Sequence, residues 1–174
     1  IINLASEEAL ADMLCALGEE RFARSIARAI VEVRAQAPIT TTKELVDAVL
    51  QGTPVWYQRR RIHPATKTFQ ALRIAVNDEL GALREGLSTA IDRLSDGGRI
   101  AVISFHSIED RIVKIMLKER AHDGTGVLVT KKPITPSRAE LMTNPRARSA
   151  KLRVFEKGMS QGHAPSPVSH YTYA

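Results

Sequence analysis

Residues 66–116 change their hydrophobic period twice, and this change sets the fold class. Across residues 66–94 apolar side chains recur every three or four positions, which predicts one long amphipathic helix: Phe69, Leu72, Val76, Leu80, Leu83, Leu87, Ile91 and Leu94. Asp96-Gly97-Gly98 ends this helix, and the continuous apolar run over residues 99–105 predicts a buried parallel strand. Another helix follows at once. Helix, strand and helix in this order predict an α/β sheet with crossover connections.

The flanking segments predict the rest of the chain. Residues 1–52 have the pattern of three helices, the first capped by Ser6 and the third by a capping box of Thr41 and Glu44. Residues 53–65 carry two prolines and a charge run, which predicts an ordered loop at a domain boundary. After the central helix, strands are expected near residues 127–130 and 151–155, with a capping box of Ser137 and Glu140 between them.

Composition narrows the classes of partner. The 174 residues include 25 Lys and Arg against 19 Asp and Glu, and a formal charge of +6 weakly favours a polyanion such as nucleic acid. The single cysteine, Cys15, excludes a disulfide framework and fits a reducing cytoplasm. No run approaches the roughly 20 apolar residues of a membrane-spanning helix, so no membrane partner is expected. The first residues lack both a methionine and a signal peptide, which suggests a start inside a longer protein.

The junction after the first predicted strand is one candidate site. In open parallel sheets, ligands bind at the carboxyl ends of the strands, and His106 is expected at that lip. Ser107 and Asp110 fit a capping box for the next helix. The alternative is that this pair only caps the helix and His106 takes no part. A Ser-His-Asp triad is rejected, because its members come from separate elements and no Gly-x-Ser-x-Gly elbow is present.

Two basic segments are candidates for nucleic-acid contact. Five cations lie within fifteen residues beside Trp56 and Tyr57, a combination suited to phosphate contact and base stacking: Arg59, Arg60, Arg61, Lys67 and Arg73. A later cluster comprises Lys131, Lys132, Arg138, Arg146, Arg148, Lys151 and Arg153. The alternative for both is a solvated basic surface without a partner. The sequence has no dinucleotide-binding glycine motif, no P-loop and no metal-ligand spacing, so no metal is expected.

Several strings occur together and in order. They are IHPATKTFQALRIAVNDEL at residues 62–80, GGRIAVISFHSIEDRIVK at residues 97–114 and NPRARSAKLR at residues 144–153, together with EERFAR at residues 19–24 and PITTT at residues 38–42. They resemble the bacterial family that methylates N4 of a cytosine in small-subunit ribosomal RNA. The resemblance implies a Rossmann-like methyltransferase domain interrupted by an all-helical insert that helps to bind RNA.

Mapped onto this chain, the resemblance implies two parts. Residues 1–63 resemble the helical insert, and residues 64–157 the C-terminal part of the methyltransferase sheet with about three strands. Residues 158–174 lie beyond the resemblance, and their richness in Gly, Ser, Pro and His predicts a disordered tail. The family's site for S-adenosylmethionine, a glycine-rich loop and an acidic residue after the first two strands, would lie upstream. Nothing in this chain matches that site, so the residues that bind the cofactor are unknown here.

The implied reaction moves a methyl group from S-adenosylmethionine to the exocyclic amine of a cytidine, with ribosomal RNA or the ribosomal subunit as partner. Placement and resemblance together make His106, Ser104 and Asn77 catalytic candidates, and Thr68, Phe69, Gln70 and Ser107 substrate-binding candidates. The RNA-binding candidates are Arg59, Arg60, Arg61, His63, Lys67, Arg73, Arg146 and Arg148.

Three functions remain open from the sequence: part of a methyltransferase without its methyl-donor half, a noncatalytic RNA-binding piece, or an interaction protein without an RNA role. The strand at residues 99–105 is apolar on both faces and should be central in a complete sheet. Without an upstream neighbour it becomes an exposed apolar edge. We therefore expect the chain alone to self-associate, with this strand pairing across a two-fold axis.

Overall fold

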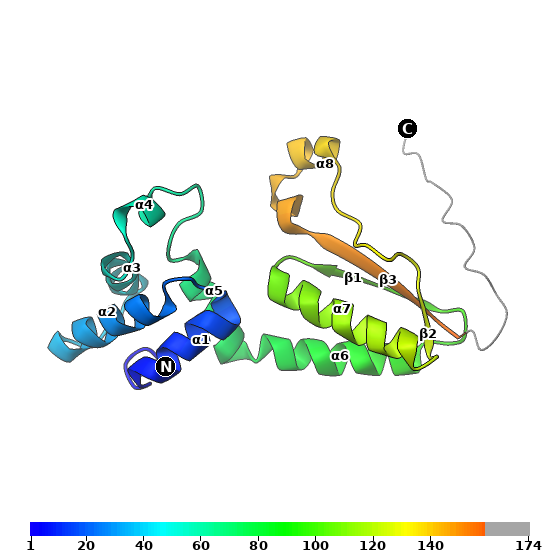
Figure 1. The fold of residues 1–174 in the computed structure, drawn as a ribbon, viewed down its shortest axis with the longest axis horizontal. Coiled ribbons are helices and arrows are strands. Elements are labelled where there is room, and N and C mark those ends of the chain that lie inside the picture. The colour runs from blue at the N-terminus through cyan, green and yellow to red at the C-terminus, as the bar shows by residue number, and fades with distance from the viewer. Residues whose placement is uncertain (159–174) are drawn as a thin grey trace. The chain divides into compact units, whose positions relative to one another are not determined.

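The computed structural model describes residues 1–158 and divides the chain into two compact units, Ile1–Glu79 and the residues from Leu80 onward. The first is a helical unit (Figure 1). Its helices are α1 (Glu7–Gly18), α2 (Ala23–Gln36), α3 (Thr42–Gln51), α4 (Val55–Gln58) and α5 (Thr66–Asn77). The short helix α4 lies in the segment that the sequence predicted as a loop, and its start follows Pro54.

The predicted caps of the helical unit are confirmed. The Ser6 hydroxyl accepts a hydrogen bond from the Ala9 amide, and Thr41 with Glu44 forms a complete capping box at the start of α3. These side chains satisfy amides that have no partner within the helix. The core beneath them is apolar and fully buried, and includes Leu10, Leu14, Ile26, Ile30 and Val49.

Helix α5 packs directly on α1 because Gly18 has no side chain. A Cβ at this position would lie 2.7 Å from the Lys67 carbonyl oxygen, too close for any real contact. The Lys67 ammonium then donates to the Glu19 carbonyl at 2.6 Å, where α1 ends. The left-handed residue that follows α1 is Glu19, with φ of 49°, and not a glycine. Gly18 therefore serves close packing.

The prediction of one long helix over residues 66–94 is wrong. The helix breaks at Asp78, which adopts a left-handed conformation with φ of 46°, and α6 (Glu79–Arg93) begins afterwards. Asp is one of the few residues that tolerate this conformation. The Glu79 carboxylate accepts two hydrogen bonds from the Arg73 guanidinium, at 2.8 and 3.0 Å. The two compact units meet at this break in the chain, later than the domain boundary that the sequence placed at residue 63.

The second unit is a sheet unit with two long helices packed on one face (Figure 1). After α6 come β1 (Arg99–Ser104), α7 (Ser107–His122), β2 (Gly126–Leu128), α8 (Arg138–Thr143), the 3-10 helix η1 (Pro145–Ser149) and β3 (Lys151–Lys157). The strand order is β1-β3-β2, and both pairs are antiparallel. Helices α6 and α7 pack on the same face, where Leu87, Ile91, Val113, Leu117 and Phe155 form the core.

Strand β1 is neither parallel nor fully buried, in contrast to the prediction for residues 99–105. Among residues 1–158, β1 pairs only with β3, and it does so in antiparallel register with Val102 opposite Arg153. Its residues alternate between the core face and an exposed face, so Ile103 is 58 % exposed. The prediction of a buried parallel strand is thus wrong for this part of the chain, whereas the expected apolar edge is present. The predicted tail lies, after Gly158, outside the described residues.

Candidate functional site

The junction between β1 and α7 is built around His106. Its Nδ1 atom accepts a hydrogen bond from the Glu109 amide at 3.3 Å, and Glu109 Oε2 accepts from the Phe105 amide at 3.0 Å. His106 and Glu109 thus form the capping box of α7. The prediction that Ser107 and Asp110 form this box is wrong by one position, because Asp110 is engaged elsewhere. His106 is a structural residue of this junction and not a bystander.

This cap fixes the tautomer of His106. Because Nδ1 accepts from an amide, the neutral ring carries its proton on Nε2. That nitrogen is buried and has no hydrogen-bond partner among the described residues, although Glu109 Oε1 lies 3.3 Å away. In this state Nε2 is the only donor atom of the neutral ring. The ring cannot accept a proton from a substrate without giving up the cap.

Asp110 ties the start of α7 to β3. Its Oδ1 accepts from Arg153 Nε at 2.7 Å, and its Oδ2 accepts from Lys151 Nζ at 3.0 Å. Burial alone would raise the pKa of Asp110, but the hydrogen bonds and charges of Arg153 and Lys151 outweigh it and lower that pKa below its usual value. The sequence analysis missed this group, although Lys151 and Arg153 are two apart on a strand and therefore share a face.

Ser104 occupies the last position of β1, opposite Lys151 in the register. Its hydroxyl is buried and donates weakly to the Lys151 carbonyl at 3.5 Å. Ser107 is exposed on the first turn of α7. The structure therefore brings three of the predicted site residues, Ser104, His106 and Ser107, together at the carboxyl end of one strand.

The remaining substrate candidates belong to the helical unit. Thr68 is completely buried between helices, and Phe69 packs against the same apolar core. Gln70 donates to the Leu17 carbonyl at 3.5 Å, and the exposed Asn77 donates to Glu79 at 3.3 Å. Each of these side chains thus has a local structural role within the unit that carries it.

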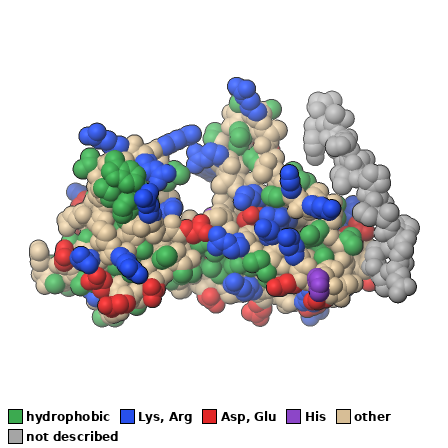
Figure 2. All heavy atoms as spheres, in the orientation of Figure 1, with side chains coloured by type: hydrophobic (Ala, Val, Ile, Leu, Met, Phe, Trp, Pro, Cys, Tyr) green, Lys and Arg blue, Asp and Glu red, His purple; other side chains and the backbone are tan. Residues whose placement is uncertain are grey.

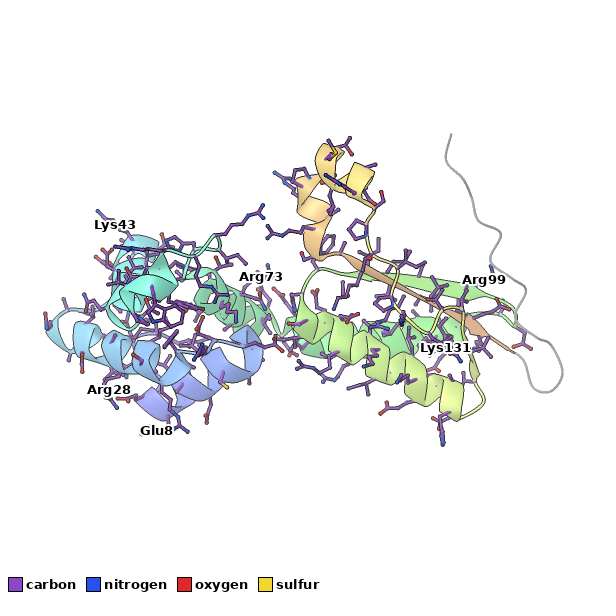
Figure 3. The ribbon with its side chains drawn as sticks, turned by 45° about the horizontal axis from the view of Figure 1, so that its top comes forward. Glu8, Arg28, Lys43, Arg73, Arg99 and Lys131 are labelled. Carbon is purple, nitrogen blue, oxygen red and sulfur yellow. The ribbon has the colours of Figure 1, made fainter. Side chains whose placement is uncertain are left out.

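The RNA-binding candidates fall into two groups. Lys67 caps α1 and Arg73, labelled in Figure 3, pairs with Glu79, so both have partners within the helical unit. Lys and Arg side chains gather over both units (Figure 2), and the exposed candidates are Arg59, Arg60, Arg61 and His63 near α4, and Arg146 and Arg148 on η1.

The hollow on the sheet unit does not suit S-adenosylmethionine. It is lined mainly by apolar side chains such as Ile103, Ile134 and Leu152, and its one acidic residue is Glu140. The amides at the start of α7 are already taken up by its capping box. No cluster of metal-ligating side chains occurs within residues 1–158. No helix in this range is both long and apolar enough to cross a membrane.

Comparison with known proteins supplies the family. The model of the MraW methylase family matches residues 1–158. A protein of Coprothermobacter proteolyticus named ribosomal RNA small subunit methyltransferase H is 53 % identical over 159 residues, which cover 91 % of this chain and 52 % of that protein. Proteins of the same name from Persephonella marina and Synechococcus elongatus are each 52 % identical over 157 residues, 90 % of this chain and 54 % and 51 % of theirs. The chain spans about half the length of these relatives.

Proposed function

The chain belongs to the MraW methylase family, and on this basis we propose that it is the C-terminal part of an S-adenosylmethionine-dependent methyltransferase that modifies N4 of a cytidine in small-subunit ribosomal RNA. The observation that carries the proposal is the match of the family model to residues 1–158. The segment that holds Ser104, His106 and Ser107 lies inside that match. In this proposal the chain lacks the half that binds the methyl donor, and it is inactive alone.

The proposal assigns separate tasks to the two units. In the sheet unit, Ser104, His106 and Ser107 are the residues proposed to contact the reacting cytosine. In the helical unit, Asn77, Phe69 and Gln70 are the candidates for contact with the substrate RNA, whereas Thr68 is completely buried in this structure. The exposed arginines near α4 and on η1 contact the phosphates of the ribosomal RNA in the cytoplasm. An exocyclic amine is a poor nucleophile, because its lone pair is delocalised into the ring, so orientation of the base is the main contribution.

His106 supports this assignment as a donor rather than as a base. With the proton on Nε2, which is buried in this structure, the ring would donate to a carbonyl or ring nitrogen of the pyrimidine once substrate binding uncovers that atom, and this bond would orient the amine. S-adenosylmethionine would supply the methyl group from its sulfonium. The hollow on the sheet unit does not suit that cofactor, and no step of this proposal runs through it.

A reconstitution experiment tests the proposed function. The chain would be joined to the upstream half of the Persephonella marina relative and incubated with small ribosomal subunits and S-adenosylmethionine carrying a labelled methyl group. Nucleoside analysis of the RNA should show N4-methylcytidine. Calorimetry should show cofactor binding by the joined protein and none by the chain alone. Cofactor binding by the chain alone, or a label on another nucleoside, would contradict the proposal.

A pair of variants separates the chemistry of His106 from its cap. His106→Asn keeps an N-cap of the preferred kind, whereas His106→Ala removes it. If the imidazole orients the base, both variants should lower the rate of methyl transfer by the joined protein at least about tenfold. This is the loss expected when one hydrogen bond between neutral groups is removed. Full activity of the Asn variant would assign His106 to capping alone.

A further inference from the structure

Three aromatic rings from two distant segments form a cluster on the helical unit. The ring centroids of Phe22, Trp56 and Tyr57 lie 4.8 to 5.8 Å apart in edge-to-face arrangements. Tyr57 is buried, whereas the Trp56 side chain is 55 % exposed. The cluster thus presents one indole ring at the surface on a rigid aromatic base.

A buried carboxylate holds this cluster in place. The Tyr57 hydroxyl donates to Glu20 Oε2 at 2.9 Å, and the Phe22 amide donates to Glu20 Oε1 at the same distance. Glu20 is itself almost fully buried. Glu20 therefore joins the turn between α1 and α2 to helix α4. Because Trp56 is the neighbour of Tyr57 on α4, its backbone is held in place by these hydrogen bonds.

Two arginines flank the rings. The Arg21 guanidinium carbon lies 5.8 Å from the centroids of both Phe22 and Trp56, and that of Arg60 lies 5.3 Å from the Tyr57 ring. We call Arg21, Phe22, Trp56 and Arg60 the aromatic-arginine surface. A groove of about 330 Å³ adjoins it, and its lining includes Arg21, Phe22 and Arg24 together with the acidic residues Asp12 and Glu20. Figure 2 shows Lys and Arg side chains beside hydrophobic ones over this unit.

We propose that the aromatic-arginine surface binds single-stranded RNA, with one base stacked on Trp56 and the neighbouring phosphates on Arg21 and Arg60. Stacking on an exposed ring requires an unpaired base, and arginines beside the ring supply the phosphate contact. An acidic peptide would satisfy the arginines but leave the indole face unused. The choice of RNA rests on the proposed function, whereas the surface itself rests on the geometry above. Sequence analysis pointed to Trp56 and Arg60 but not to Arg21 and Phe22.

The chain carries its own reporter, because Trp56 is its only tryptophan. The full chain would be titrated with an oligoribocytidylate of about 12 nucleotides, within the usual size of a single-strand site. We expect quenching of the indole fluorescence, and much weaker quenching by a duplex of that strand with oligoriboguanylate. Quenching by oligoglutamate instead of RNA, or no response to RNA, would overturn the proposal.

Variants of the aromatic ring test the stacking. Binding of fluorescein-labelled RNA should weaken about fivefold to 100-fold in Trp56→Ala, the range expected for one lost stacked base. Trp56→Phe should stay within about threefold of the wild type, because a smaller ring still stacks. Val55→Ala, on the same turn of α4, is the matched control. Circular dichroism confirms folding, and equal affinity of Trp56→Ala and Val55→Ala would overturn the proposal.

A pair of arginine variants tests the phosphate contact. Arg21→Gln and Arg28→Gln remove the same charge from exposed sites of the helical unit, and Arg28 is labelled in Figure 3. Only Arg21→Gln should lower the slope of log affinity against log salt, by about 0.7 for one phosphate contact on a single strand. Equal slopes in the two variants would overturn the assignment. If Trp56→Ala, joined to the upstream half, still methylates ribosomal subunits, the proposed function stands without this surface.

Discussion

Asp110 and Arg153 are 43 residues apart in the chain and form a hydrogen bond of 2.7 Å between Oδ1 and Nε. Their side chains are only 11 % and 12 % exposed. A pair this well buried stabilises the fold only while both partners are present, because either one alone is a charge without a partner. The bond also joins the first turn of α7 to the central strand of the sheet.

Removal of the Asp110 charge should therefore destabilise the sheet unit strongly. We expect Asp110→Asn to lower the free energy of unfolding by about 3 kcal/mol, because Arg153 is left buried without its counter-charge. Arg99→Gln is the control, since the Arg99–Glu156 pair is exposed and should contribute less than about 1 kcal/mol. Urea denaturation monitored by circular dichroism measures both. Equal losses in the two variants would contradict this account.

The same carboxylate predicts a loss of stability in acid. The folded-state pKa of Asp110 is lowered, so the unfolded chain binds its proton more readily. The stabilisation is therefore fully present above the unfolded pKa, near 4, and is lost as pH falls through the folded pKa. Unfolding measured between about pH 6 and pH 2.5 should show a steeper decline in the wild type than in Asp110→Asn. Parallel curves for the two proteins would refute the prediction.

Tyr57 predicts a loss of stability at the alkaline end. Burial, and next the hydrogen bond to Glu20, raise the pKa of Tyr57 from 10.0 to about 12. The folded state thus keeps a proton that the unfolded chain has released, so stability is complete below about pH 10 and falls as pH rises to about 12. Tyr57→Phe should remove this fall. At neutral pH it should cost about 1–3 kcal/mol, because buried Glu20 loses the Tyr57 hydroxyl and keeps only the Phe22 amide as a donor. Absorbance of the phenolate, compared between the two proteins, locates the titration.

Gly18 and Gly86 should respond to alanine with opposite signs. A Cβ at Gly18 would overlap the Lys67 carbonyl, so Gly18→Ala should separate α1 from α5 and cost about 1–3 kcal/mol. No atom lies within 4 Å of a Cβ built at Gly86, in the middle of α6, so Gly86→Ala should stabilise the protein by up to about 1 kcal/mol through helix propensity. Thermal unfolding of both variants decides the matter, and a stabilised Gly18→Ala would show that the two helices adjust.

The free edge of β1 should drive self-association of the chain alone. Ile103 is exposed there, and β1 has β3 as its only partner strand among residues 1–158. Introduction of a lysine on an edge strand disfavours pairing with a second copy. Ile103→Lys should therefore sediment as a monomer at concentrations where the wild type associates. Ile115→Lys places the same charge on exposed α7 and should leave association unchanged. A wild type that stays monomeric at high concentration would count against this mode of assembly.

The order of the elements could be predicted from hydrophobic period, but their breaks and pairings could not. Val76 and Leu80 keep a helical spacing across Asp78, and spacing contains no information about the backbone angle of the residue between them. Likewise, the run at residues 99–105 shows that a strand forms, whereas its antiparallel partner at residues 151–157 depends on contacts between distant segments.

The candidate site shows the same division. Ser107 and Asp110 have the residue types that caps prefer, so local rules favoured them over His106 and Glu109. The tertiary pair with Arg153 removes Asp110 from that role. Trp56 could be recognised beside a basic run, whereas Arg21 and Phe22 lie beside it only because the fold brings two distant segments together. The residue types that can cap a helix or stack on a base could be recognised in the sequence. Their tertiary partners, which decide the role that each residue takes, could not.

The strand order β1-β3-β2 also has a consequence for the newly made chain. Strands β1 and β2 do not pair with each other. Each pairs with β3, which is synthesised last and ends at Lys157. At the usual rate of synthesis, the roughly fifty residues between the end of β1 and the end of β3 take several seconds to appear. Throughout that interval the apolar strand β1 lacks its hydrogen-bonding partner within the unit. A premature stop codon before Lys151 would remove both strand pairings at once, and we expect such a truncated chain to be degraded.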